Sequence, residues 1–380
     1  MTKITDIPAI RFKGFSDTWE QRKLSEIATM HARIGWQNLR TSEFLDSGDY
    51  MLITGTDFID GAVNFDTCHY VERERYEQDK HIQIRNGSIL ITKDGTLGKV
   101  AYIQGLTMPA TLNAGVFNVE IKDENEVDNR YLFQYLKAPF LMDYVDKKAT
   151  GGTIKHLNQN ILVDFPVVLP HKAEQEKIGE YFLAIDHLIT LHQRKYDKLT
   201  NVKKSMLEKM FPQNGSNAPE IRFKGFTEAW EQRKLGDVVD VRSGKDYKHL
   251  SEGNIPVYGT GGFMLSVNQA LSYDEDAIGI GRKGTIDKPY ILKAPFWTVD
   301  TLFYAIPREK VDLNFAFDVF QNIDWKKKDE STGVPSLSKT AINEIDVLVP
   351  QYDEQQPLGQ FFNRIDNLIT LHQRKYDKLT

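Results

Sequence analysis

The stretch LITLHQRKYDKLT occurs twice without change, at residues 188–200 and 368–380, and the rest of the chain is organised around it. A second repeat precedes each copy, as PAIRFKGFSDTWEQRKL at 8–24 and PEIRFKGFTEAWEQRKL at 219–235. The tails lie 180 residues apart and the heads 211, so the two halves differ in length between these points. Internal repeats of this kind indicate a duplicated architecture. Each half therefore consists of a constant head, a variable body and a constant tail.

Both tails are predicted to be long helices. From about residue 173 to 211, and again from 353 to 380, bulky residues recur at steps of three and four. A heptad pattern sustained this far is typical of coiled coils and not of isolated surface helices. The expected seam consists of Ile178, Phe182, Ile185, Ile189, His192, Tyr196, Leu199, Lys203, Met206 and Met210 in the first helix, and of Leu358, Phe362, Ile365, Ile369, His372, Tyr376 and Leu379 in the second.

The order of the segments predicts how the helices are used. The first helix spans on the order of 57 Å and ends at FPQNGSNAPE (211–220), the clearest linker of the chain. The second is expected to be about three turns shorter, because it has no copy of NVKKSMLEKMF (201–211). Two helices with matching seams and a short connection should pack antiparallel. The prediction is two bodies held apart by a rod and related by a pseudo-twofold axis, an arrangement that suits a DNA duplex.

The bodies are predicted to be mixed β structure, which makes the fold class α+β. Short apolar runs alternate with glycine-containing turns, and each body carries one amphipathic helix. Four regions are expected: a first recognition body at 1–150, a central conserved region at 151–218, a second body at 219–331 and a distal conserved region at 332–380. The expected strands and helices lie at 51–63, 88–103, 117–121 and 127–149 (with a break near Pro139) in the first body, and at 254–264, 276–292 and 311–325 in the second.

Composition excludes several classes of protein. Cys68 is the single cysteine and cannot form an internal disulfide, which indicates a reducing compartment. The N-terminus has no apolar signal region and no stretch approaches eighteen apolar residues, so we expect a cytoplasmic protein without a membrane anchor. The net charge of −5 argues mildly against a uniform nucleic-acid coat. It still permits DNA contact through local basic loops.

Two glycine-containing turns carry basic residues. GIGRKG (279–284) matches a dinucleotide fingerprint, but the TIDKPYIL that follows predicts a strand where a nucleotide site requires a helix. GTLGK (95–99) lacks the spacing and the Ser or Thr of a P-loop. We therefore expect a hairpin tip in each body that contacts DNA, the alternative being a solvated basic hairpin. The candidate residues are Lys93, Thr96 and Lys99 in the first body and Arg282, Lys283 and Lys288 in the second.

Two further loops are candidates for DNA contact. ATGGTIKH (149–156) has glycines for close backbone approach, and a structural turn fits it equally well. RSGKDYKH (242–249) could read a groove or be a polar connection. The candidate residues are Thr153, Lys155 and His156 in the first loop and Arg242, Lys245, Tyr247 and Lys248 in the second.

The sequence predicts neither a metal site nor a catalytic centre. His192 and His372 lie on the seam, where a polar residue that sets the register is favoured over a metal pair, since antiparallel packing need not bring the two together. No HxxxH or CxxC spacing occurs. The chain has no Asn/Asp-Pro-Pro-aromatic stretch of an amino-methyltransferase and no convincing nuclease centre. Any chemistry would therefore come from partners.

The tail region resembles a known family. KATGGTIKHLNQNILVDFPVVLPHKAEQEKIGEYFLAIDHLI (148–189) is similar to the conserved region of the specificity subunit of type I restriction-modification systems, and it recurs as LVPQYDEQQPLGQFFNRIDNLI (348–369). ITKDGTLGKVAYI (91–103) is typical of that family's target recognition domains. The second copy departs from the first at Val334-Pro335 and in its Gln-Gln-Pro.

The resemblance implies a non-catalytic reader of double-stranded DNA. Each body would read one half of a bipartite asymmetric site, and the helix pair would measure the unread spacer. The chain itself would bind no cofactor. Two methyltransferase subunits that use S-adenosylmethionine would dock on it to direct DNA methylation, and restriction subunits that use ATP and Mg²⁺ would complete the restriction system. The alternatives are a coiled-coil scaffold that joins two protein-binding modules without a DNA role, and a methyltransferase, which the missing motifs disfavour.

The near-identity of the repeats beside dissimilar bodies suggests a further hypothesis. Constant segments would allow recognition bodies to be exchanged by recombination between repeats.

Overall fold

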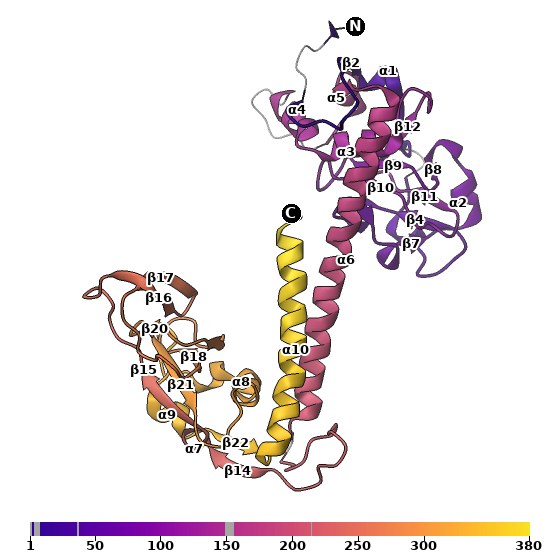
Figure 1. Cartoon of the computed structure of the whole chain (residues 1–380). Helices are drawn as coiled ribbons and strands as arrows, with labels where there is room; N and C mark the ends of the chain where they lie inside the picture. Colours follow the sequence, from indigo (N-terminus) through magenta and orange to yellow (C-terminus); the bar gives the residue numbers. More distant parts are fainter. Residues whose placement is uncertain (1, 4–7, 36–37, 149–155, 214) are drawn as a thin grey trace. The chain divides into compact units, whose positions relative to one another are not determined.

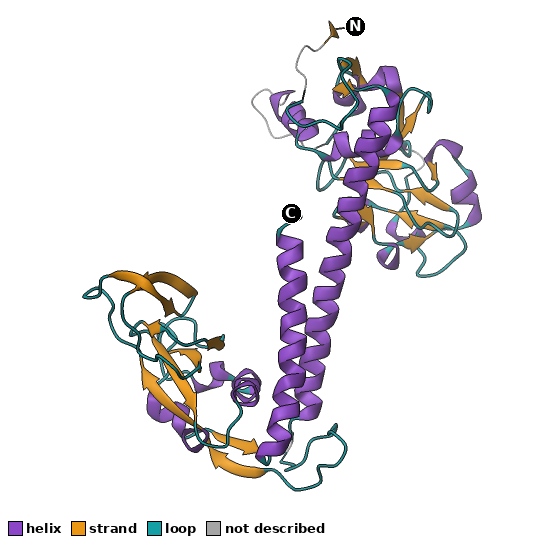
Figure 2. Cartoon of the chain, in the orientation of Figure 1, coloured by secondary structure: helices purple, strands orange, loops and turns teal. Residues whose placement is uncertain are grey.

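The computed structural model describes residues 2–3, 8–35, 38–148, 156–213 and 215–380 (Figure 1). Its contacts divide the chain into two compact units, Met1–Leu188 and Ile189–Thr380, which we call unit 1 and unit 2. The predicted α+β class is confirmed, since both units combine strands with helices (Figure 2). None of the described helices is long and apolar enough to cross a membrane.

Unit 1 is built on an antiparallel sheet with the strand order β10-β9-β12-β3. Its central strands are β9 (Ile89–Thr92), which is buried along its whole length, and β12 (Val116–Ile121), whose first four residues are buried. Successive side chains of β9 point to opposite faces, so Ile89 and Ile91 pack under helices while Leu90 packs against a second sheet. Unit 1 therefore has three layers: helices, a central sheet and a smaller outer sheet.

The outer sheet of unit 1 has the order β7-β4-β11-β8, with β4 and β11 parallel. The helix α3 (Asn129–Lys137) is capped at its N-terminus by Asp128, whose carboxylate accepts hydrogen bonds from backbone N–H groups of the first turn. It ends before Pro139, where the sequence predicted a break. The other elements of unit 1 are β1 (Thr2–Lys3), β2 (Glu20–Lys23), α1 (Leu24–Ile27), β3 (Ala28–His31), β4 (Met51–Ile53), β5 (Phe58–Ile59), β6 (Ala62–Val63), β7 (His69–Tyr70), α2 (Arg73–Glu77), β8 (Gln83–Ile84), β10 (Val100–Tyr102), β11 (Ala110–Leu112), α4 (Phe140–Lys148), α5 (Gln159–Val163) and β13 (Pro166–Leu169).

Unit 2 repeats this plan with different residues. Its main sheet has the order β15-β21-β18-β19, which matches β3-β12-β9-β10 strand for strand. Helix α8 (Leu313–Asn322) begins at Asp312 as α3 begins at Asp128. The remaining elements of unit 2 are β14 (Glu231–Lys234), α7 (Leu235–Val238), β15 (Val239–Ser243), β16 (Glu252–Gly259), β17 (Gly262–Val267), β18 (Ala277–Gly281), β19 (Tyr290–Leu292), β20 (Trp297–Thr298), β21 (Leu302–Pro307), α9 (Lys339–Asn343) and β22 (Asp346–Val349).

The constant segments close each unit around its variable body. In unit 1 the head strand β2 pairs antiparallel with β13, the strand that leads into the long helix; in unit 2, β14 pairs with β22 in the same way. Arg11 of the first head forms a two-pronged ion pair with the buried Glu174, with N–O distances of 2.6 and 2.7 Å. Arg222 forms the equivalent pair with the buried Glu354, at 2.7 Å for both contacts. Such bidentate geometry fixes orientation as well as distance.

The glutamine that follows each of these glutamates ties the long helix to the body. In unit 1 the side-chain oxygen of Gln175 accepts from the backbone N–H of Asp128, and its amide donates to the carbonyl of Pro170. Gln355 accepts from Asp312 and donates to Pro350 in unit 2. The Glu-Gln pair therefore positions the body helix and the long helix together in both units.

The two long helices are α6 (Lys172–Met210) and α10 (Tyr352–Asp377), which have 39 and 26 residues. α6 begins in unit 1 and continues into unit 2, where its C-terminal part lies beside α10 (Figure 1). His192 contacts His372, and Lys203 forms an ion pair with Asp366. Residue numbers rise along one helix as they fall along the other, so the predicted antiparallel packing is confirmed within unit 2.

The two seam histidines contact each other, which the sequence left open. The two Nδ1 atoms lie 2.9 Å apart and the ring centroids 5.1 Å apart, so antiparallel packing does bring these residues together. Because both lie at the same place in the repeat, each approaches the other across the internal symmetry of the helix pair. One ring must donate and the other accept, which requires an unprotonated Nδ1. Burial lowers the pKa of His372, and the neighbouring His192 adds to this effect.

The seam differs from the prediction at its N-terminal end. Ile178 packs against the apolar core of unit 1 beneath α3, so it serves the body instead of a helix pair. Phe182 is 46% exposed, whereas Phe362, its counterpart in the repeat, is fully buried. Unit 2 covers Phe362 with Phe211, whose ring lies 6.1 Å away. The other seam positions are at least partly buried: Ile185, Ile189, His192, Tyr196, Leu199, Lys203, Met206 and Met210 in α6, and Leu358, Ile365, Ile369, His372 and Tyr376 in α10. Leu379 is also partly buried, but it lies beyond the end of α10 at Asp377, so the helix is slightly shorter than the predicted 353–380.

One further expectation needs correction. Phe211 is not a linker residue, since it is 5% exposed and packs in the core of unit 2. The run 51–63 forms short strands separated by turns, as expected, with a 3₁₀ turn at Gly55–Asp57 between β4 and β5. The carboxylate of Asp57 accepts from the backbone N–H of Thr54, a local bond that competes with strand pairing.

Candidate nucleic-acid interface

The basic loop of unit 2 connects β18 to β19 in an antiparallel hairpin. This confirms the hairpin interpretation of GIGRKG, since no helix follows it. The backbone conformation explains two of the glycines. A Cβ on Gly281 would collide with the carbonyl oxygen of Thr285, and Gly284 has a φ of +98°. Both positions require glycine for the turn itself. The motif is therefore explained without a bound nucleotide.

The loop of unit 2 is held in place by the segment that precedes α9. The backbone N–H of Leu337 donates to the carbonyl of Arg282 at 2.9 Å, and that of Gly284 donates to Pro335 at 2.8 Å. The Arg282 guanidinium donates to the carbonyl of Asp300 and lies 5.9 Å from the Phe303 ring centre. The exposed basic side chains thus stand on a backbone fixed from both sides.

A cavity of about 670 Å³ lies beside this loop. Arg282, Lys283 and Lys339 bring three cations to its wall, and Asp300 and Glu330 bring two carboxylates. Lys288 is exposed on the same loop. Cations and hydroxyls converging on a rigid loop are the groups that bind phosphate oxygens and base edges.

The equivalent loop of unit 1 connects β9 to β10. Lys93 occupies the position of Arg282, and its carbonyl accepts from the backbone N–H of Leu157 at 2.8 Å. This is the same anchor as the bond between Leu337 and Arg282 in unit 2. The Lys93 ammonium lies 5.3 Å from the Phe117 ring centre. Thr96 and Lys99 are exposed on the loop, so the structure brings all three predicted residues of unit 1 to one hairpin.

The remaining sequence candidates are placed less favourably. Arg242 lies in strand β15 and pairs with Asp240 at 2.7 Å and Glu275 at 3.5 Å, and these carboxylates raise the pKa of the guanidinium. The Nδ1 of His156 lies 2.6 Å from the Asp94 carboxylate, so this ring already has a polar partner within unit 1. Tyr247 packs on an apolar cluster, while Lys245 and Lys248 are exposed. Thr153 and Lys155 lie outside the described residues.

Two basic features were missed in the sequence. Lys339 is the first residue of α9, next to the N-cap Ser338, and it reaches the cavity beside Arg282. The exposed run Lys326–Lys328 forms a 3₁₀ turn, where Lys326 pairs with Asp287 of the hairpin loop at 3.0 Å. The run WKKK (325–328) was a visible signal. The role of Lys339 was not visible, because it depends on the contact between two distant loops.

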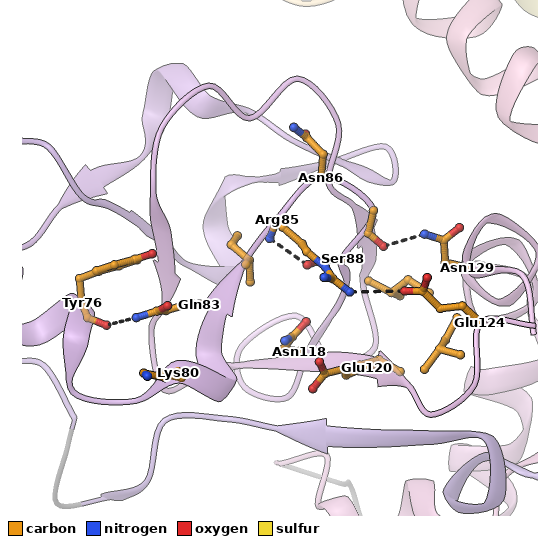
Figure 3. A pocket seen from close by; sticks show the side chains of 15 residues that line it. Tyr76, Lys80, Gln83, Arg85, Asn86, Ser88, Asn118, Glu120, Glu124 and Asn129 are labelled. Carbon is orange, nitrogen blue, oxygen red and sulfur yellow. Dashed lines mark hydrogen bonds and ion pairs between the residues drawn. The ribbon is translucent and has the colours of Figure 1, made fainter.

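A second polar cavity, of about 720 Å³, lies in unit 1 between β8 and β12 (Figure 3). Arg85 donates to Glu124 at 3.4 Å across it, and Gln83 donates to the carbonyl of Tyr76. Lys80 and Glu120 also line it, so opposite charges balance each other here. Its two cations are matched by two carboxylates, whereas three cations and two carboxylates line the cavity beside the hairpin of unit 2, and we do not assign the unit 1 cavity to DNA.

Two units of matching topology, each with a basic hairpin and joined through a long helix, define a duplicated recognition protein. The model of the type I restriction modification DNA specificity domain matches residues 16–201 and again residues 227–380. These matches cover most of the chain, which therefore belongs to this family. Its role is that of the DNA specificity subunit of a type I restriction-modification system, a non-catalytic component.

Individual relatives agree with this assignment. The type I restriction enzyme MjaVIII specificity subunit of Methanocaldococcus jannaschii is 24% identical over 344 residues, covering 79% of this chain and 77% of the relative. The putative MjaX specificity subunit of the same organism is 24% identical over 410 residues, covering 100% and 92%. The crystal structure of the type I restriction-modification S subunit from M. genitalium has the same fold, with a TM-score of 0.71 at 17% identity, covering 100% of this chain and 96% of that one.

Proposed function

We propose that each unit reads one half of a bipartite asymmetric DNA site through its basic hairpin. The observation that carries this proposal is the match between the two loops. Lys93 and Arg282 follow equivalent strands. The carbonyl of each accepts a backbone hydrogen bond from a leucine two residues before a short helix, α5 in unit 1 and α9 in unit 2. The two hairpins have the same backbone anchor but different side chains, so they would read different bases. Lys93, Thr96, Lys99, Arg282, Lys283 and Lys288 are the proposed contact residues, with Lys339 added from the structure.

Docking would place these loops against the groove edges. Backbone phosphates would position each unit, and the side chains that reach base edges would supply sequence specificity. Lys245 and Lys248 are exposed and remain candidates for phosphate contact. Arg242 is the weaker candidate, since leaving Asp240 and Glu275 would cost it two ion pairs.

We further propose that the helix pair sets the length of the unread spacer. α6 is a continuous helix that leaves unit 1 and enters unit 2. An uninterrupted helix transmits distance and rotation between its ends, at about 1.5 Å and 100° per residue. The number of residues in α6 would then determine which separation of half-sites is accepted.

The proposed partners supply the chemistry. Two methyltransferase subunits carrying S-adenosylmethionine would dock on this chain, and restriction subunits using ATP and Mg²⁺ would join them. Such a complex acts on DNA inside the cell, which fits a cytoplasmic location.

Exchange of recognition bodies remains part of the proposal. The Arg11–Glu174 and Arg222–Glu354 pairs are made by the constant segments of each half, so they do not depend on the body between them. A body inserted between these segments would find the same closing contacts. Sequencing the locus in sister isolates tests this idea, and bodies that never vary would count against it.

One experiment separates the DNA reader from the protein scaffold. The chain is co-expressed with the methyltransferase encoded beside it, and adenine methylation is mapped across the genome. We expect a bipartite motif with a fixed gap. Replacing residues 220–331 with the body of a related chain should change one half of the motif and leave the other unaltered. A scaffold without a DNA role would produce no motif, and a methyltransferase would methylate when expressed alone.

A further inference from the structure

Three potential metal ligands meet on one face of the central sheet of unit 1. They are His31 at the end of β3, His81 in the 3₁₀ turn Lys80–Ile82, and Glu120 in β12. One ligand atom from each side chain lies within 4.8 Å of the other two. Ligands at positions so far apart in the sequence have no recognisable spacing, which is why the sequence predicted no metal site.

Sheet register brings two of the three together. In the antiparallel pair of β3 and β12, His31 is opposite Asn118 and Thr29 is opposite Glu120. His31 and Glu120 are therefore diagonal neighbours on one face, within reach of long side chains. The Nε2 of His31 lies 3.8 Å from the Glu120 carboxylate and 3.1 Å from the Thr29 hydroxyl.

The third ligand is positioned by hydrogen bonds to its own backbone. The N–H of His81 donates to the carboxylate of Asp79 at 2.9 Å, and its carbonyl accepts from the side-chain amide of Asn118 at 3.0 Å. Asn118 and Glu120 lie next to each other on the floor of the cavity in Figure 3. The His81 and His31 rings are nearly parallel, with centroids 4.5 Å apart and an interplanar angle of 20°. The turn that carries His81 is thus tied to the strand that carries Glu120.

The chemistry of this set suits a borderline divalent transition metal. Two imidazole nitrogens and one carboxylate are ligands of Zn²⁺, and the same combination binds related ions such as Co²⁺. Coordination at roughly 2.0–2.2 Å would draw the ligand atoms to about 3.3 Å from one another. His81 and Glu120 are exposed, so small rotations of their side chains can close the remaining distance. Asp79 adds a second carboxylate beside the site, while the Lys122 ammonium is bonded to the carbonyl of Ser25.

We propose that His31, His81 and Glu120 form a binding site for a divalent transition metal ion of the Zn²⁺ class. Three protein ligands leave at least one coordination position for water or for an external donor. The ion would link β3, β12 and the turn before β8, and so stabilise this part of unit 1. This inference does not depend on how the units read DNA.

The test uses the full chain without a histidine tag, freed of metal with a chelator and then titrated with Co²⁺. We expect the visible absorption of Co²⁺ bound to nitrogen ligands, its displacement by Zn²⁺, and a rise in Tm on adding Zn²⁺. His81→Gln or Glu120→Gln should weaken binding by at least about tenfold, since even the loss of an outer-shell partner costs 10–100-fold. The same variants should lose the Zn²⁺-dependent rise in Tm.

Two controls make the result specific. His69→Gln changes another exposed histidine of unit 1 and should leave Co²⁺ binding intact. His192→Gln removes one half of the other close histidine pair and should also leave it intact. Circular dichroism checks that each variant is folded. Absorption that survives His81→Gln, or that disappears with His192→Gln, would overturn the proposal.

Discussion

At the scale of single residues, Arg282 is the side chain whose replacement should affect DNA recognition most directly. Its side chain is exposed, its backbone is fixed by Leu337, and its guanidinium lies near the Phe303 ring. Arg282→Gln keeps the hairpin but removes the charge. We expect the assembled complex to bind DNA more weakly. If Arg282 contacts a base, the loss should be about 1–3 kcal/mol and the specificity at that position should relax. If it contacts a phosphate, the slope of log affinity against log salt concentration should fall by about one.

Affinity measured across a salt series distinguishes these outcomes. Arg233→Gln is the matched control, because Arg233 lies on β14 in the same unit and pairs with the neighbouring Glu231. Its effect should be small. If Arg282→Gln left both the affinity and the salt slope unchanged, the hairpin would not be the DNA-contacting element.

A buried acid in unit 2 allows a prediction about stability. Asp318 of α8 is 1% exposed, and its Oδ2 has no hydrogen-bond partner. Burial raises the pKa of Asp318 well above 3.8, although Lys203 opposes the shift. It lines a cavity of about 280 Å³ together with Asp366. In unit 1 the corresponding residue is Gln134, whose amide donates to Asp186 at 2.7 Å.

We therefore expect Asp318→Asn to raise the free energy of unfolding at neutral pH by about 1–3 kcal/mol, the range for relieving an unsatisfied buried polar atom. The stability of the wild type should fall with rising pH because the folded chain binds one more proton than the unfolded chain. As pH rises through 3.8, the unfolded Asp318 loses its proton while the folded one keeps it, so the wild type loses stability. The asparagine variant does not titrate, so its advantage should shrink toward pH 4. Urea unfolding at several pH values measures this, and a pH-independent difference would contradict it.

At the scale of elements, the repeated helices show how one sequence acquires two environments. Phe182 and Phe362 occupy the same place in the repeat, yet only Phe362 is buried. Its ring packs with Phe211, which in turn contacts Trp230 and Phe315. Phe362→Ala should therefore destabilise unit 2 by about 3–5 kcal/mol through the cavity it leaves.

The matched variant Phe182→Ala should cost no more than about 1 kcal/mol, as expected at an exposed position. Calorimetry of the two variants side by side tests the contrast. Equal losses would mean that Phe182 is covered in solution by something that the fold of unit 1 does not supply.

At the scale of the whole molecule, α6 is the element on which the proposed spacer length depends. Asp186 of α6 bonds to the body of unit 1 through Gln134 and Lys137, and Ile189 is the first residue of unit 2. An insertion after His187 falls between these two residues and leaves the contacts of Asp186 in place. Seven residues add two turns, or about 10 Å, and preserve the face of the helix.

With that insertion, methylation mapping should give a longer gap or no activity, with both half-sites unchanged. A two-residue insertion is the matched control, since it rotates the units by about 200° while adding only about 3 Å. We expect it to abolish activity. A change in the sequence of either half-site would contradict the role of the helix as a spacer.

Much of this architecture is visible in the sequence because it depends on local periodicity and repetition. The heptad steps around LITLHQRKYDKLT identify which face of each helix is covered, and Ile189 and Ile369 lie on that face as expected. Pro139 ends a helix because a proline cannot extend it. The hairpin at GIGRKG was predictable because TIDKPYIL favours a strand. Each of these depends on neighbours a few residues away.

Tertiary structure decided the rest, because contacts between distant segments follow no local pattern. The heptad pattern places Phe182 on the apolar face of α6. Whether another segment covers that face depends on the tertiary structure. Lys339 lines the same cavity as Arg282 only because Leu337 pairs with the hairpin. His31 and Glu120 converge through strand register, and His81 joins them through the bond between its carbonyl and Asn118. The sequence by itself determined the repeats, the helix faces and the turns, since these are short-range preferences. The folded chain determined which equivalent residues become core, which stay exposed and which form a site.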